Sequence, residues 1–292
     1  MVTEERSTDQ KERDHFFARP VGCDRERLRA TFDEVAGLYD AARPRYPLAL
    51  YDDLVELTGI GPKDRLLEVG CATGIATRPL LERGYELVCL EPGLRLAAAA
   101  RRNLRSHPAD VRCTHFETFT GPPDRFGLVF AATAWHSIDP DVRYRHGHAL
   151  LARGGHLAFW NALHAFPADV DPFFEKIGAV YEEIGWPRAG DWPPPTPDQI
   201  ADDAGEITAS GLFSDIQTRR YVWDISYTAE QYIALLATFS SHIALPPAHR
   251  EHLYDWIRAE IASRPSHQLR RHWYAILHIA RRRDVATDDS KG

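Results

Sequence analysis

The chain has 292 residues, of which 44% are hydrophobic and 26% charged, as expected of a globular protein with a sizeable core. Its formal net charge of -7 argues against a general nucleic-acid or anionic-membrane surface, because such binding needs clustered Lys or Arg. The one basic concentration, "LRRHWYAILHIARRR", has an apolar centre and is predicted to be a buried last strand or helix with solvated ends.

The first residues, "MVTEERSTDQKERDHFFARP", lack the apolar segment of a signal peptide. Later apolar runs stay short of the roughly 20 residues that a membrane span needs. The cysteines at 23, 71, 89 and 113 are widely spaced and form no C-x-x-C pair, which suits reduced thiols. We therefore expect a cytoplasmic protein that binds neither membranes nor nucleic acid.

Taken in chain order, the sequence first predicts a helix within "CDRERLRATFDEVAGLYDAARPRYP", stopped by Pro44 and Pro47. Short apolar runs then alternate with helical patterns. The runs are "RLLEV", "ELVCL", "DVRCTHF", "FGLVFAATAW" and "HLAFWNAL". This alternation is typical of an α/β fold with a parallel sheet. A proline-rich stretch, "WPRAGDWPPPTPDQI", separates the two halves of the chain.

The turn after the first predicted strand, "LLEVGCATGIATRPLLERGY", carries Gly70 and Gly74. Free amide groups at such a strand-to-helix turn face ligands in open α/β sheets, although a tight turn without a ligand is the alternative. The dinucleotide pattern G-x-G-x-x-G is poorly matched, because Ala72 and Ile75 occupy its second and third glycine positions. No Gly-Lys-Ser or Gly-Lys-Thr follows, so a phosphate loop is excluded.

The second predicted strand ends in an acid, Glu91, in "LVCLEPG". A carboxylate at this position can accept both hydroxyl protons of a ribose. Exposed acids at strand ends also occur by chance, so Glu91 alone does not decide the ligand.

These motifs resemble those of the class I S-adenosylmethionine-dependent methyltransferases, in particular the trans-aconitate-like group of small-molecule enzymes. The resemblance covers roughly residues 30 to 160. Glu68, Gly70 and Gly74 match the family's E/D-x-G-x-G-x-G, and "YDAARPRYP" matches its Y-x-x-x-R-P-x-Y-P. "CTHFETF", "FGLVFAATAWHSIDP" and "LLARGGHLAFW" match its third, fourth and fifth strand regions.

The resemblance implies a Rossmann-like, doubly wound, mostly parallel seven-stranded sheet with an N-terminal helix and a helical, aromatic lid insertion. It implies S-adenosyl-L-methionine as cofactor. The cofactor-binding residues that it implies are Tyr39, Arg43, Glu68, Gly70, Cys71, Ala72, Gly74, Glu91, Pro92, His115, Phe116, Ala132 and Thr133.

The sequence departs from the family pattern at three positions. Ala72 replaces a glycine, which an extended backbone would tolerate and a left-handed one would not. His115 stands where an acid often contacts the adenine amine, which leaves adenine recognition to the backbone. Gly127 replaces the acid that usually opens the fourth strand, with an effect expected on strand geometry rather than on catalysis.

A sulfonium methyl is already activated, so alignment and exclusion of water are the main requirements, and neither a metal nor a nucleophile is needed. His136, just past the fourth strand, is the candidate catalytic base, and a positioning role is the equal alternative. His146 and His148 are expected to be solvated or capping residues rather than metal ligands, and His164 an ordinary loop histidine.

We expect methyl transfer to a small, partly apolar molecule, with a homo-oligomer left open. The alternatives are a nicotinamide-dependent oxidoreductase and a catalytically inactive cofactor-binding regulatory protein. The predicted organisation is a flexible arm (1–24), the cofactor-binding core (25–165), a lid insertion (166–210), the rest of the core with cap helices (211–283) and a disordered tail (284–292).

Overall fold

The computed structural model describes residues 32–33, 35–186 and 192–284, and the chain forms two compact units. The core unit comprises Arg45–Ala162, Ala201–Tyr221 and the chain from Ala275 onward. The second unit comprises the chain up to Pro44, Leu163–Ile200 and Val222–Tyr274. The predicted N-terminal arm, including Cys23, and most of the predicted tail lie outside the described residues.

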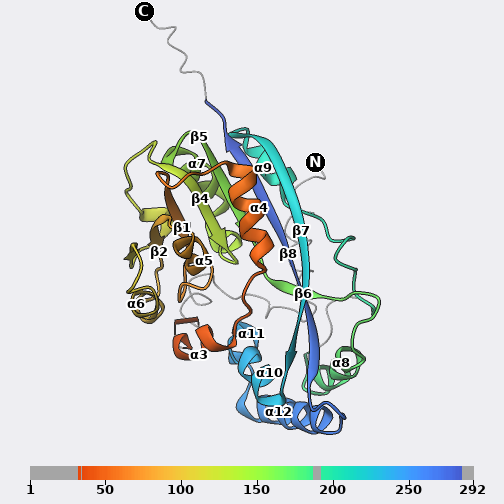
Figure 1. Cartoon of the computed structure of the whole chain (residues 1–292). Coiled ribbons are helices and arrows are strands. Elements are labelled where there is room, and N and C mark those ends of the chain that lie inside the picture. The colour runs from red at the N-terminus through yellow and green to blue at the C-terminus, as the bar shows by residue number, and fades with distance from the viewer. Residues whose placement is uncertain (1–31, 34, 187–191, 285–292) are drawn as a thin grey trace, which may run out of the picture. The chain divides into compact units, whose positions relative to one another are not determined.

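Strands and helices alternate along most of the core unit (Figure 1). They are α4 (Leu48–Thr58), β1 (Arg65–Val69), α5 (Thr77–Glu82), β2 (Glu86–Leu90), α6 (Leu94–Asn103), β3 (Ala109–Arg112), η1 (Phe116–Thr118), β4 (Phe126–Ala132), η2 (Trp135–Ser137), α7 (Pro140–Leu150), β5 (Leu151–Trp160) and α9 (Ala204–Ser210). Two long strands, β7 (Phe213–Tyr227) and β8 (Leu269–Arg282), contribute residues to both units.

The sheet of the core unit has the order β3-β2-β1-β4-β5-β8, and β7 also pairs with β8. The five strands from β3 to β5 are parallel, and β8 is antiparallel to β5. The predicted Rossmann-like α/β class is therefore confirmed. The last basic and apolar segment is a strand, which decides between the two forms that the sequence allowed.

Helices cover both faces of this sheet, which is why its strands are apolar on both sides. On one face α7 packs on β4 and β5, and α9 packs on α7. A core cluster that includes Trp135, Phe159 and Ile207 fills this side. On the other face α4, orange in Figure 1, packs on β5 and α5, and the ring of Tyr51 meets that of Trp160 edge-on at 6.0 Å.

Proline and glycine residues fix the ends of the two helices that precede the first strand. The helix α3 (Ala36–Ala42) ends one residue before Arg43, whose extended backbone (ψ 142°) suits the residue before Pro44. The predicted stop at this proline is confirmed. Pro47 is the N-cap of α4, and Gly59 ends it with a left-handed φ of 63°. This fixes where the chain enters β1.

The second unit contains α3, β6 (Leu163–Ala165), α8 (Phe173–Glu183), α10 (Ala229–Leu236), α11 (Ser240–Ile243) and α12 (Pro247–Ala262). Strand β6, which the sequence did not predict, pairs antiparallel with the first half of β8. Aromatic rings fill its interior, including Phe173, Phe174, Tyr181 and Tyr232. The described helices of both units are too short or too polar to cross a membrane.

Candidate active site

The turn after β1 is closely packed and has an unusual backbone. Gly70 and Gly74 have φ values of 72° and 90°. A Cβ added at Gly70 would lie 2.5 Å from the Cβ of Ala134, and one at Gly74 would lie 2.9 Å from Leu104 Cδ1. The amides of Gly70 and Cys71 both donate to the carbonyl of Leu90, at 2.8 and 3.0 Å. Conformation therefore requires glycine at both positions, and at Gly70 the fixed Cβ of Ala134 also leaves no space for a side chain.

Ala72, at the centre of this turn, has a φ of 47°. The backbone is thus left-handed, the conformation that disfavours a side chain, rather than the extended form that would accommodate the alanine methyl. Strained residues of this kind cluster at ligand sites, where the surrounding structure enforces them.

Glu91, which follows β2, ties the turn to the neighbouring strand. Its Oε2 accepts a hydrogen bond from the amide of Ala72 at 2.9 Å, and its Oε1 accepts one from the amide of Gly93 at 2.8 Å. The side chain is buried, with 6% of the residue exposed. A carboxylate at the end of this strand can accept the hydroxyls of a ribose. Pro92, next in the chain, accepts from Cys113 Sγ through its carbonyl.

Two predicted site residues lie beneath the turn rather than at its surface. Glu68 is 1% exposed and accepts a 2.5 Å hydrogen bond from Thr77 Oγ1. Burial, opposed by that hydrogen bond, raises the pKa of Glu68 to about 8. Cys71 is also buried, and its hydrogen bond with Cys89, together with burial, raises its pKa well above the ordinary value. Both side chains support the turn from within the core.

The segment after β3 carries the predicted adenine-binding pair. His115 is half-buried and directly precedes η1. Phe116 is 3% exposed, and its ring packs against those of Trp135 and His146 at 6.0 and 4.8 Å. His146 Nε2 lies 3.0 Å from the Phe119 carbonyl, so it has the structural role expected of it.

The end of β4 provides a second strained residue at the same edge of the sheet. Ala132 is the last residue of β4, and Thr133 has a φ of 57°. Thr133 Oγ1 lies 2.7 Å from the hydroxyl of Tyr46 and accepts from the amide of Ala162 at 3.2 Å. His136 follows in η2 and is exposed.

Tyr46 is a site residue that sequence reasoning missed. It is the second tyrosine of "YDAARPRYP", and the motif therefore offered the signal. Its ring also meets that of Trp160 edge-on at 5.8 Å. A side chain from the loop before α4 thus reaches the end of β4.

Tyr39 and Arg43 belong to the second unit. The Arg43 guanidinium stacks over the rings of Tyr39 and Phe239, at 4.9 and 4.5 Å, and its Nη2 donates to the Thr238 carbonyl at 2.8 Å. These contacts fix the guanidinium within its own unit.

Packing explains why residue 127 is a glycine instead of the expected acid. A Cβ at this position would lie 2.9 Å from the Cβ of Asp64. The expected effect on strand geometry is supported by the register shift between Phe126 and Leu128, where β4 pairs with β5.

The described residues contain no group of three or more His, Cys, Asp or Glu side chains arranged to hold a metal ion. They do fit S-adenosylmethionine: the turn after β1 has the left-handed glycine backbone of a ligand-binding turn, and the buried carboxylate of Glu91 follows β2, where a ribose is bound in such sheets.

Residues 67–159 match the methyltransferase-domain family. An uncharacterized methyltransferase of Mycobacterium tuberculosis is 26% identical over 246 residues, which cover 84% of this chain and 90% of that protein. A candidate type II methyltransferase from Anaeromyxobacter dehalogenans shares the fold with a TM-score of 0.58 at 22% identity, covering 82% of this chain and 97% of the other.

Phosphoethanolamine N-methyltransferase 2 of Haemonchus contortus, solved with S-adenosyl-L-methionine, has a TM-score of 0.51 at 13% identity. The match covers 91% of this chain and 62% of that one. The sheet order, the glycine turn and these matches indicate that the core unit contains an S-adenosylmethionine-dependent methyltransferase domain with the class I fold.

Proposed function

We propose that the protein transfers the methyl group of S-adenosylmethionine to a small, partly apolar molecule by in-line displacement. The observation that carries this proposal is the edge of the core sheet, where Glu91 anchors the strained turn at Ala72 and Tyr46 contacts the strained Thr133. Strain and buried polar contacts gathered at the ends of β1, β2 and β4 are typical of a ligand site in an open α/β sheet.

Each residue in this proposal has a definite task. Gly70 and Gly74 let the backbone approach the cofactor, and Glu91 accepts the hydroxyl protons of its ribose. Backbone amides near His115 and Phe116 form hydrogen bonds with its adenine. When bound, the cofactor supplies an electrophilic methyl on a sulfonium. The chain then has to hold the acceptor in line and keep water away, which can contribute on the order of 7–11 kcal/mol.

We assign the acceptor side of the reaction to His136, which is exposed just beyond β4. Its imidazole takes a proton from a neutral acceptor or, for an ionised acceptor, only positions it. If His136 is the base, His136→Asn should lower the turnover number by roughly 10²–10⁴-fold, and the wild-type rate should rise with pH across the range in which histidines titrate. Initial rates against pH measure both effects.

His136→Gln is a second amide variant, whose side chain is one methylene group longer than that of asparagine. Near-normal turnover and an unchanged pH profile in both variants would rule out the base and leave a positioning role.

The lid is the second element of the proposal. The aromatic segment predicted to cover the acceptor contains Phe166, which is buried and packs edge-on against Trp192 at 5.9 Å. We propose that this segment, with the N-terminal helix, excludes water from the reacting atoms.

The acceptor itself can be found by mass spectrometry. The purified enzyme is incubated with S-adenosylmethionine and pooled cell metabolites, and products that gain one methylene unit are sought. We expect such a product with wild type and none with Gly70→Val. An acceptor of macromolecular size, or no methylated product together with normal cofactor binding, would contradict the proposal.

A further inference from the structure

Arg271, on β8 in the second unit, is a buried cation that forms no ion pair with an acid in the described part of the chain. Two arginines of the described chain are buried at the level of the whole residue, Arg143 with 5% and Arg271 with 6% exposed. Arg143 forms an ion pair with Glu206. Among the described residues no carboxylate lies within ion-pair distance of Arg271. Since a buried charge is costly unless it is paired, the guanidinium of Arg271 requires an explanation.

Aromatic rings and neutral groups surround Arg271. Its guanidinium lies 4.3 Å from the ring of Trp273 and 5.8 Å from the rings of Tyr232 and Phe239. Nη1 donates to the Tyr232 hydroxyl at 3.4 Å, and the buried Nε donates to no described atom. Ring contacts lower the cost of burial but supply no hydrogen-bond acceptor. The fork of donors is thus only partly used.

His164 offers a second incomplete polar group nearby. It is paired in register with Trp273, so that His164, Trp273 and Arg271 lie on the same face of the β6 and β8 ladder. Its buried Nε2 has no hydrogen-bond partner among the described atoms. Burial, with the charge of Arg271, keeps the pKa of His164 well below its usual value, so the imidazole is neutral. His164 lies in β6 and not in the loop that was expected from the sequence.

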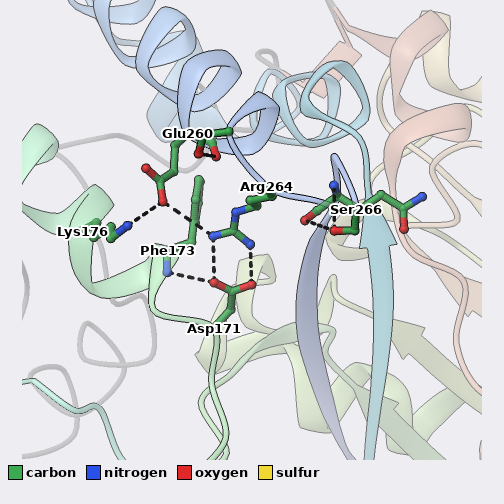
Figure 2. A network of polar contacts seen from close by, with 8 residues as sticks. Asp171, Phe173, Lys176, Glu260, Arg264 and Ser266 are labelled. Carbon is green, nitrogen blue, oxygen red and sulfur yellow. Dashed lines mark hydrogen bonds and ion pairs between the residues drawn. The ribbon is translucent and has the colours of Figure 1, made fainter.

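The same unit shows what a structural arginine looks like. Figure 2 shows Arg264 facing Asp171, which accepts from both of its terminal nitrogens at 2.6 and 2.9 Å. Glu260 lies 3.9 Å from Arg264 and also accepts from Lys176. Arg264 stacks on the ring of Phe173 at 5.5 Å, just as Arg271 stacks on its own rings. The two arginines therefore share the aromatic contact and a buried Nε without a partner among the described atoms, and they differ in the carboxylate.

We propose that Arg271 and His164 form a binding site for the carboxylate of a small molecule with a planar, apolar body. The carboxylate would accept from Nε of Arg271 and from the imidazole, and the rings of Trp273, Tyr232 and Phe239 would contact the apolar body. Binding of the anion stands by itself. Arg271 and His164 both belong to the second unit, so the site lies within that unit.

Direct binding tests the site without the cofactor. Benzoate, phenylacetate and hexanoate, each with its uncharged amide as matched control, are titrated into the full chain by calorimetry. We expect at least one acid to bind tenfold or more tightly than its amide, and Arg271→Gln to abolish that preference while Arg264→Gln keeps it. No acid preference in wild type, or an equal preference in Arg271→Gln, would overturn the site.

A stability measurement needs no ligand. Arg271→Met removes an unpaired buried cation and should leave the melting temperature equal to or above that of wild type. Arg264→Met breaks an ion pair, leaves Asp171 unpaired and should lower it. If Arg271→Met lowers the melting temperature as much as Arg264→Met does, Arg271 is a structural cation and the proposal is wrong.

Discussion

Glu68 shows how a single buried carboxylate can support the turn from below. Its pKa of about 8 results mainly from burial and is raised further by the negative charge of Glu91. Above pH 4.5, the ordinary pKa of a glutamate, the unfolded chain releases a proton that the native state keeps. The contribution of this group to the free energy of unfolding is therefore complete below pH 4.5 and is lost as pH rises through about 8.

Glu68→Gln should remove this pH dependence. The amide keeps an acceptor for Thr77 Oγ1 and cannot ionise, so the free energy of unfolding should fall less between pH 5 and 8 than in wild type. The difference is up to about 4 kcal/mol, since one unit of pKa corresponds to about 1.4 kcal/mol. Urea unfolding at both pH values measures it.

The exposed Glu56→Gln on α4 is the matched control and should keep the wild-type slope. Equal slopes for wild type and Glu68→Gln would mean that Glu68 is ionised in the native protein.

Sequence alone identified Glu91 as a strand-end acid because its spacing from the glycine turn matches a known pattern. It did not reveal that the carboxylate accepts hydrogen bonds from two backbone amides, since these bonds depend on the conformation of the turn at Ala72. It also missed Tyr46, whose partner Thr133 is 87 residues away in the chain. The motif "YDAARPRYP" contains Tyr46 itself, but a contact over such a separation leaves no local signal of the partner.

Substitutions in the turn after β1 should change the binding of the cofactor. Gly70→Val should abolish binding of S-adenosylhomocysteine, because a side chain there is strained by the φ of 72° and collides with Ala134. Ala72→Gly should bind as wild type does. Its stability should change by less than about 1 kcal/mol, since relief of the left-handed strain and greater freedom of the unfolded chain oppose each other. Calorimetry and thermal unfolding give the two values.

A folded Gly70→Val protein that binds S-adenosylhomocysteine normally would show that the turn is not the cofactor site. Loss of binding in Ala72→Gly would instead show that the alanine methyl makes a contact of its own.

The parallel strands could be predicted because short apolar runs alternate with helical patterns. β8 could not be told from a helix, since its apolar centre from Trp273 to Ala280 is buried on both faces and has no period. β6 was missed for a different reason. It has three residues, and it exists through pairing with β8, more than 100 residues later.

At the scale of the molecule, the chain combines a cofactor-binding core with a second unit drawn from three separate stretches. Composition could not reveal this division, because β7 and β8 pass through both units without a linker. The lid was predicted from its aromatic residues, and these form part of the interior of the second unit.

Hydrogen exchange tests whether the aromatic segment acts as a lid. On addition of S-adenosylhomocysteine, amide exchange should slow in the lid segment around α8 and in α3, because a lid that closes over a ligand orders its backbone. Strand β4, in the centre of the sheet, is the internal control and should change little. Equal rates in α8 and α3 with and without the compound would leave these aromatic residues a purely structural role.

We propose that the core unit binds S-adenosylmethionine at the edge formed by the glycine turn and Glu91. Calorimetric titration with S-adenosylhomocysteine tests it most directly, with NADH as the competing ligand. We predict that wild type binds S-adenosylhomocysteine and not NADH. Glu91→Ala should weaken binding by roughly 1.5–3 kcal/mol, the scale of hydrogen bonds to a charged group. Binding of NADH instead, or an affinity for S-adenosylhomocysteine that Glu91→Ala leaves unchanged, would contradict the account.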